Sequence, residues 1–118
     1  MAIRSPEEWE ALPEIMCPVI EGARKGSIYT VHAVGFLAMP VTGCKEVDLS
    51  GVLVEGEKCL LPTATIEFAE ERQLCKLPLQ LSDWALQAVA LARQLGRSPF
   101  PLQVEFGILN GSHYAEML

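Results

Sequence analysis

The sequence predicts an α+β fold: a single antiparallel sheet of about five hairpin-connected strands covered by one long helix, with a short helix near the N-terminus. Two patterns predict this class. Between residues 26 and 77, short runs of β-branched and apolar residues alternate with turn signals, which is typical of consecutive hairpins. Between residues 82 and 96, apolar side chains recur at the helical period of about 3.6 residues.

The length of 118 residues fits one domain whose core needs no metal or disulfide to stabilise it. The chain has no internal repeat and no low-complexity linker. We therefore expect one domain over residues 1–118, divided into a short helix plus loop (1–25), hairpin strands (26–77), the long helix (82–96), a final strand (100–109), and a turn and tail (110–118).

The short helix is predicted over residues 6–12, where Ser5 is a favourable N-cap and Pro6 suits the first helical position. The longest strand is predicted at Ile28–Met39, with a bend or bulge at Gly35. Further strands are predicted at 47–54, 59–61, 63–68 and 74–77, with Pro62 as an interruption between the second and third of these.

The long helix is predicted to begin at Ser82, a favourable N-cap residue, and to end at Gly96. Its apolar arc has alanine at the centre and larger side chains on the flanks, so the helix can lie close against a sheet. Leu86 falls outside this arc. An apolar side chain on the polar side of a helix indicates a contact with another subunit or with the N-terminal helix.

The formal net charge of −6 argues against nucleic acid or an anionic membrane as a partner, because both require a basic surface. Residues 27–44 carry no charge if His32 is neutral, but Pro40 and Gly43 interrupt a run already short for a membrane span. The N-terminus lacks the apolar core of a signal peptide, so we expect a cytoplasmic protein.

Acidic residues concentrate near the N-terminus, and together with Leu86 they form the predicted contact surface for a basic protein partner: Glu7, Glu8, Glu10 and Glu14. The four cysteines form no C-x-x-C pair and the chain has only two histidines, so we expect no metal site and no cofactor. Cys44 precedes Lys45 in a loop and is the candidate reactive thiol, because an adjacent cation lowers the pKa of a cysteine.

Three further residues are candidates for chemistry. His32 lies in the middle of the longest predicted strand, either as a catalytic imidazole or as a core histidine whose nitrogens are hydrogen-bonded. Glu67 and Glu105 lie on the polar faces of their strands and could form a carboxylate pair if those strands are neighbours. A ligand pocket between sheet and helix would be floored by Tyr29, His32, Phe36 and Phe106.

The absence of a recognisable catalytic set favours a non-catalytic interaction or accessory protein that acts through its surface as a homodimer. In size, charge and order of elements, the chain resembles the dimeric chaperones of bacterial secretion systems. The alternative is a small-molecule-binding protein or enzyme with its pocket around His32. A more remote alternative is a redox sensor that uses the Cys44 thiol.

Overall fold

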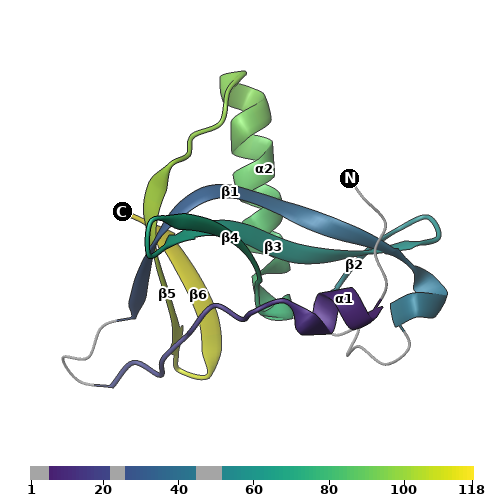
Figure 1. The fold of residues 1–118 in the computed structure, drawn as a ribbon, viewed down its shortest axis with the longest axis horizontal. Helices are drawn as coiled ribbons and strands as arrows, with labels where there is room; N and C mark the ends of the chain where they lie inside the picture. The colour runs from purple at the N-terminus through teal and green to yellow at the C-terminus, as the bar shows by residue number, and fades with distance from the viewer. Residues whose placement is uncertain (1–5, 22–25, 45–51) are drawn as a thin grey trace.

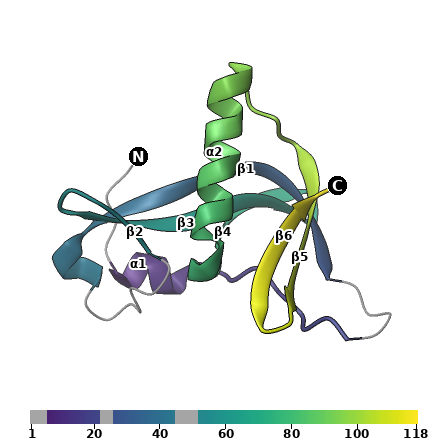
Figure 2. The same ribbon diagram turned by 180° about the vertical axis from the view of Figure 1, so that it is seen from behind.

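A computed structural model describes residues 6–21, 26–44 and 52–118. The fold is α+β, with a curled antiparallel sheet, one long helix and one short helix (Figures 1 and 2). Along the chain the elements are α1 (Pro6–Ala11), β1 (Ser27–Pro40), η1 (Val41–Cys44), β2 (Leu53–Glu55), β3 (Lys58–Phe68), β4 (Glu71–Lys76), η2 (Leu79–Leu81), α2 (Ser82–Leu95), β5 (Leu102–Leu109) and β6 (Ser112–Met117).

The strand order is β2-β3-β1-β5-β6, and β4 pairs with β3 beside β2. The two long strands explain the curl. The first residues of β1 pair with β5 and the remainder pairs with β3, so β1 belongs to both halves of the sheet. The β5–β6 hairpin consequently turns away from the β3–β4 hairpin, as both views show.

Pro62 does not interrupt the sheet, because β3 runs unbroken through it and pairs it with Phe36 of β1. The carbonyl of Pro62 accepts a hydrogen bond of 3.0 Å from the Leu77 amide, on the edge opposite β1. The N–H and C=O of one strand residue point the same way, so the missing N–H faces this same edge, between β2 and β4. The predicted interruption is therefore wrong, since no pairing with β1 requires that donor.

The irregularity of β1 lies at His32 and not at Gly35. Val31 pairs with Ile66 and Ala33 pairs with Thr65, which leaves His32 as an extra residue without a partner on β3. Gly35 pairs regularly with Thr63. The extra residue forms a β-bulge, which bends a strand and strengthens its twist.

The long helix ends as predicted, with Gly96 in the left-handed conformation at φ +68°, but it does not begin with a side-chain cap. Its N-cap is Leu81, because η2 runs directly into α2. Ser82 instead donates its hydroxyl to the carbonyl of Leu79 at 2.7 Å. In the described parts of the chain, we find no helix with the length and apolar character that crossing a bilayer requires.

The core lies between α2 and the sheet. Ala85 and Ala88 are buried and α2 packs against β1 and β3, as expected for small residues at a close helix–sheet contact. Trp84 contacts the fully buried Phe106 edge to face, with ring centroids 5.8 Å apart. A second apolar cluster, around Trp9 of α1, Met39 and Leu61, lies at the other end of β1 and β3.

The residues after α1 tie the two ends of the curled sheet together. The Lys76 amide of β4 donates to the carbonyl of Pro13 at 2.9 Å. Farther along, the Ile20 amide donates to the carbonyl of Ile108 on β5 at 2.8 Å, and the Ile108 amide donates to the carbonyl of Pro18 at 2.9 Å. Residues 12–20, which we call the N-terminal segment, therefore bond to β4 first and to β5 next.

Candidate functional site

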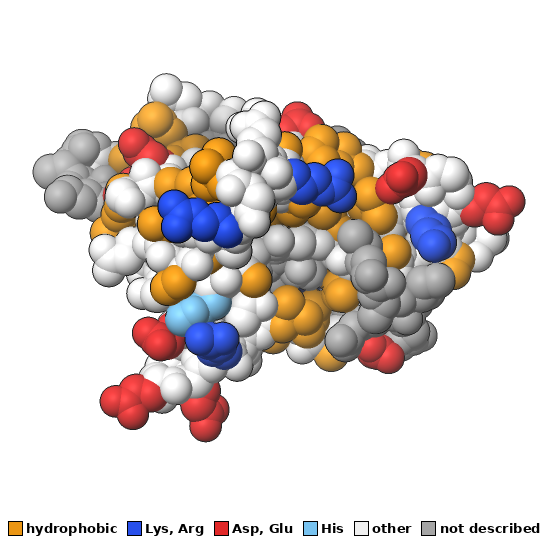
Figure 3. Space-filling view, turned by 90° about the horizontal axis from the view of Figure 1, so that it is seen from above, with side chains coloured by type: hydrophobic (Ala, Val, Ile, Leu, Met, Phe, Trp, Pro, Cys, Tyr) orange, Lys and Arg blue, Asp and Glu red, His pale blue; other side chains and the backbone are white. Residues whose placement is uncertain are grey.

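An apolar groove runs between α2 and β6. The apolar arc of α2 is wider than its contact with the core: Ala85 and Ala88 turn toward the sheet, whereas Trp84 and Leu91 stay half-buried on the flank near β6. The groove has a volume of about 420 Å³ and is lined by Trp84, Gln87, Ala88, Ala90, Leu91, Gln94 and Met117. In Figure 3, hydrophobic side chains reach the surface beside the upper end of α2.

The strand that borders this groove is the last one in the sheet. β6 pairs with β5, and within the described residues its other edge pairs with no strand. Asn110 and Gly111 both have positive φ and form a two-residue turn that makes Leu109 and Ser112 a hydrogen-bonded pair. Hydrogen-bonded pairs alternate with non-bonded ones, so the N–H and C=O groups of every second residue from His113 to Met117 point away from β5.

The side chains of those same residues face inward. His113, Ala115 and Met117 pair with Ile108, Phe106 and Val104, whose side chains are on the core face of β5. Of these three residues, Met117 lines the apolar groove, so the groove lies next to the last residues of the β6 edge. A strand added to this edge would form backbone hydrogen bonds and direct every second side chain into the groove.

The outer face of the same hairpin is acidic. Glu105 and Glu116 are directly opposite each other on β5 and β6. The Tyr114 hydroxyl donates to Glu105 at 2.6 Å, and this hydrogen bond raises the pKa of Tyr114 to about 12. The Tyr114 ring lies against Gly107, where an added Cβ would approach the ring to 2.8 Å, so the glycine makes room for it.

A second hollow, the N-terminal hollow, has a volume of about 410 Å³ and lies where the N-terminal segment meets β4, η2 and β6. Its apolar residues are Trp9, Ile15, Leu77, Pro78 and Leu79, and its polar or titratable ones are Glu14, Cys17, Lys76 and His113.

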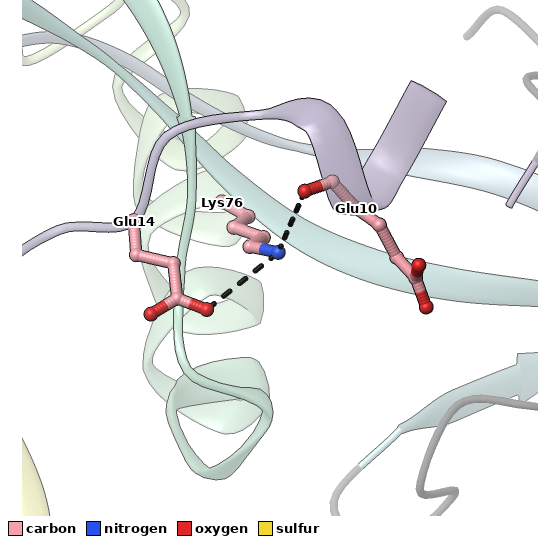
Figure 4. A network of polar contacts seen from close by, with 3 residues as sticks. All are labelled: Glu10, Glu14 and Lys76. Atoms are coloured by element: carbon pink, nitrogen blue, oxygen red, sulfur yellow. Dashed lines mark hydrogen bonds and ion pairs between the residues drawn. The ribbon is translucent and has the colours of Figure 1, made fainter. Parts of the chain in front are cut away.

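Among the described residues that line this hollow, Lys76 is the only lysine. Three groups surround its ammonium. Nζ donates to the backbone carbonyl of Glu10 at 3.3 Å, lies 3.6 Å from a carboxylate oxygen of Glu14, and sits 5.9 Å from the centre of the Trp9 ring (Figure 4). The Lys76 side chain is 15 % exposed, whereas that of Glu14 is 76 % exposed. The ammonium is thus largely buried, whereas the carboxylate that it faces belongs to a largely solvent-exposed side chain.

The acidic residues predicted as a docking surface lie in different surroundings in the structure. Glu14 faces Lys76, and Glu10 contributes its carbonyl while its carboxylate points away (Figure 4). Glu8 lies in α1, and the Glu7 side chain lies outside the described residues. Leu86 is 48 % exposed on α2 but does not line the groove.

His32 lies beside Glu67 at the bulge. Its Nε2 atom is 3.6 Å from a carboxylate oxygen of Glu67, too far for a hydrogen bond, and is buried without a hydrogen-bond partner. Thr30 pairs with Glu67 on one side and with Gln103 on the other, so β1 separates Glu67 from the strand of Glu105. The conditional carboxylate pair is therefore not formed.

The aromatic residues predicted to floor a pocket lie in the core. Phe36 and Phe106 are buried, and Tyr29 contacts Phe106 edge to face with ring centroids 6.0 Å apart. Neither hollow described above is lined by these three residues or by His32.

The described cysteines are protonated or buried thiols. Burial, assisted by the negative charge of Glu14, raises the pKa of Cys17 to about 11, and burial also raises the pKa of Cys75. Cys59 is fully buried. The Cys44 side chain lies outside the described residues. Within the described part of the chain, no group of three acidic, histidine or cysteine side chains is placed to hold a metal ion.

Sequence reasoning missed both hollows. The Asn110-Gly111 pair is a strong turn signal, after which residues 112–118 could return as a short strand, form a helical turn or fray, and the structure shows the strand β6. No sequence signal predicted the contacts of the Lys76 ammonium, since Glu10, whose carbonyl it binds, lies more than sixty positions away in the sequence. Comparison with protein-family models, with curated proteins and with solved structures finds no match to this chain.

Proposed function

We propose that this protein is a non-catalytic accessory protein that captures an extended segment of a partner protein by strand addition to β6. The observation that carries the proposal is the juxtaposition of an unpaired strand edge with an apolar groove. Backbone groups on the edge supply affinity for any extended chain, and the groove selects apolar side chains at alternate positions.

The negative charge on the outer face of the β5–β6 hairpin determines which residues the partner segment needs at the positions between its apolar ones. Glu116 is exposed and directly opposite Glu105, and like charges at opposed positions destabilise a sheet. A lysine or arginine of the added strand, opposite Glu116 on its free side, would relieve this repulsion. We therefore expect a partner segment in which apolar residues alternate with basic ones, consistent with the net charge of −6.

A synthetic peptide of alternating Val and Lys tests this proposal, with the same peptide carrying Glu in place of Lys as the control. The chain has two tryptophans, and Trp84 lines the groove whereas Trp9 does not. In spectra of ¹⁵N-labelled protein, we expect the Lys peptide to shift the Trp84 indole signal saturably and to leave Trp9 unchanged. The Glu peptide should bind more weakly.

The variant Ala115→Pro separates strand addition from simple apolar contact. The Ala115 N–H points away from β5, so proline removes a donor from the free edge without removing a bond between β5 and β6. We expect Ala115→Pro to abolish peptide binding and Ala115→Val to retain it, at similar stability of both variants.

The homodimer expected from the sequence is a distinct outcome of the same experiment. If light scattering shows a dimer that Ala115→Pro converts to a monomer, the edge belongs to a second copy of this chain. That result, or equal binding of the Lys and Glu peptides, would reject the partner proposed above.

A further inference from the structure

We infer that the N-terminal hollow is a second binding site, and that its ligand is a small organic carboxylate with an apolar body. The hollow is separate from the groove at β6 and shares no lining residue with it. Its volume of about 410 Å³ lies in the range of small-molecule sites, roughly 300–1,000 Å³.

The apolar part of the ligand is specified by the walls. Trp9 comes from α1 and Ile15 from the N-terminal segment. Leu77 and Pro78 connect β4 to η2, and Leu79 is the first residue of η2. Trp9, Ile15 and Leu77 are themselves nearly fully buried, so these walls are held by the core. A hollow with rigid apolar walls and few polar groups favours a ligand with an apolar body and one polar end.

Lys76 specifies the charge of the polar end. An ammonium group has three donors, and in this protein one of them is used by the carbonyl of Glu10. The nearest carboxylate oxygen of Glu14 is 3.6 Å away, beyond hydrogen-bond distance, and belongs to a largely exposed side chain. An incoming carboxylate can therefore displace Glu14 into water and form the short charge-assisted hydrogen bond that Glu14 does not form.

The remaining polar groups are compatible with an anion. His113 lines the β6 side of the hollow, and its ring forms no hydrogen bond or ion pair with any described residue, so it is available as a second donor. The Cys17 thiol is protonated at neutral pH, because burial and Glu14 raise its pKa to about 11. Glu14 is thus the one described anionic side chain of the hollow, and it is the one that can swing away.

Three probes of similar shape test the inference: 3-phenylpropanoate, its neutral amide, and phenylethylammonium. Trp9 lines this hollow and Trp84 lines the groove, so the two indole signals report on the two sites separately. We expect the carboxylate to shift the Trp9 signal saturably, with Trp84 unchanged. The amide and the ammonium should bind at least about tenfold more weakly.

Two charge-matched variants test the role of Glu14. Glu14→Gln removes the carboxylate that competes for Lys76, and Glu70→Gln removes the same charge at the turn between β3 and β4. We expect Glu14→Gln to tighten carboxylate binding about threefold and Glu70→Gln to leave it nearly unchanged. Lys76→Gln should lose the preference for the carboxylate over the amide, and Lys76→Arg should retain it.

Equal affinity for the carboxylate and the amide would overturn the inference, as would no saturable Trp9 shift in the native protein. Equal tightening by Glu14→Gln and Glu70→Gln would also overturn it, because net charge alone would then govern binding. The inference does not rest on the proposed function, since peptide binding is read at Trp84 and carboxylate binding at Trp9.

Discussion

His32 is the extra residue of the β-bulge, where β1 has one residue more than the stretch of β3 that pairs with it. The bulge sets the orientation of the His32 side chain. An alternating strand places a side chain on one face or the other, whereas a bulge re-aims the extra one. The imidazole of His32 is mostly covered, with its side chain 12 % exposed and Nε2 unpartnered. A buried nitrogen without a hydrogen bond costs about 1–3 kcal/mol, so at this position the histidine does not optimise stability.

His32→Leu should therefore leave the free energy of unfolding unchanged or raise it by about 1 kcal/mol, because leucine has no polar atom to bury. Urea denaturation at neutral pH measures this. Glu67→Gln is the companion variant, since it neutralises the carboxylate 3.6 Å from Nε2 and leaves the ring in place. If both variants lower stability by about 2 kcal/mol or more, the His32–Glu67 pair stabilises the fold and the interpretation above is wrong.

Tyr114 provides a residue-scale test of the outer face of the β5–β6 hairpin. The hydrogen bond to Glu105 is the main cause of its raised pKa, followed by burial and by the charges of Glu105 and Glu116. Glu105→Gln should therefore lower the pKa of Tyr114 from about 12 toward its ordinary value of 10. Ultraviolet absorbance of tyrosinate follows the titration, and Tyr114→Phe identifies the contribution of Tyr29, the other tyrosine.

The same shift has a consequence for stability, with a definite sign. Because the pKa of Tyr114 is higher in the folded protein than its ordinary value, the folded state holds this proton to higher pH than the unfolded state does. The contribution of this proton to the free energy of unfolding is fully present below pH 10 and is lost as the pH rises toward 12. Tyr114→Phe should reduce the fall in stability over this interval, and an identical fall in the variant would contradict the assignment.

Among the elements, α2 shows how far sequence periodicity reaches. Its end at Gly96 and its alanine-centred face follow from local rules, and the structure agrees with both. The start of α2 does not follow from the same rules, because η2 precedes it directly. The Ser82 hydroxyl donates to the Leu79 carbonyl of η2 instead of capping the helix. A cap residue is recognised from sequence only when the preceding backbone is non-helical, which the residues before Ser82 did not reveal.

The strands show the opposite limit of sequence reasoning. Alternation predicted the polar faces that hold Glu67 and Glu105, but it carries no information on which strands are neighbours. Whether two carboxylates meet is decided by sheet order, and here β1 lies between their strands. The continuity of β3 through Pro62 and the bulge at His32 were not predicted for the same reason. Both depend on which edge of the strand its partner occupies.

The contact of α2 with the sheet predicts how its alanines respond to enlargement. Ala85 is fully buried at this contact, whereas Ala90 is exposed on the same helix. Ala85→Leu should lower the free energy of unfolding by about 1–3 kcal/mol, because the added atoms push the helix from the sheet. Ala90→Leu makes the same chemical change and should alter stability by less than about 0.5 kcal/mol. Thermal or urea unfolding that gives equal effects would contradict this packing.

At the scale of the whole molecule, the N-terminal segment couples parts of the sheet that share few other contacts. It bonds to Lys76 near the end of β4 and to Ile108 on β5, and these strands lie on opposite sides of the β1–β3 pair. A segment bonded at both places restrains the curl of the sheet. It also forms one wall of the N-terminal hollow, so the shape of that hollow depends on the same bonds.

Ile20→Pro tests this coupling, because proline removes the amide that donates to Ile108 at 2.8 Å. We expect a loss of about 1–3 kcal/mol in the free energy of unfolding. Hydrogen exchange should then speed up at both the Ile108 and the Lys76 amides, although the substitution touches only the β5 end. Val19→Pro is the control, since the Val19 amide forms no backbone hydrogen bond among the described residues. Faster exchange at Ile108 with unchanged exchange at Lys76 would show that the two ends of the segment open independently, and the curl would then be a property of β1 and β3 alone.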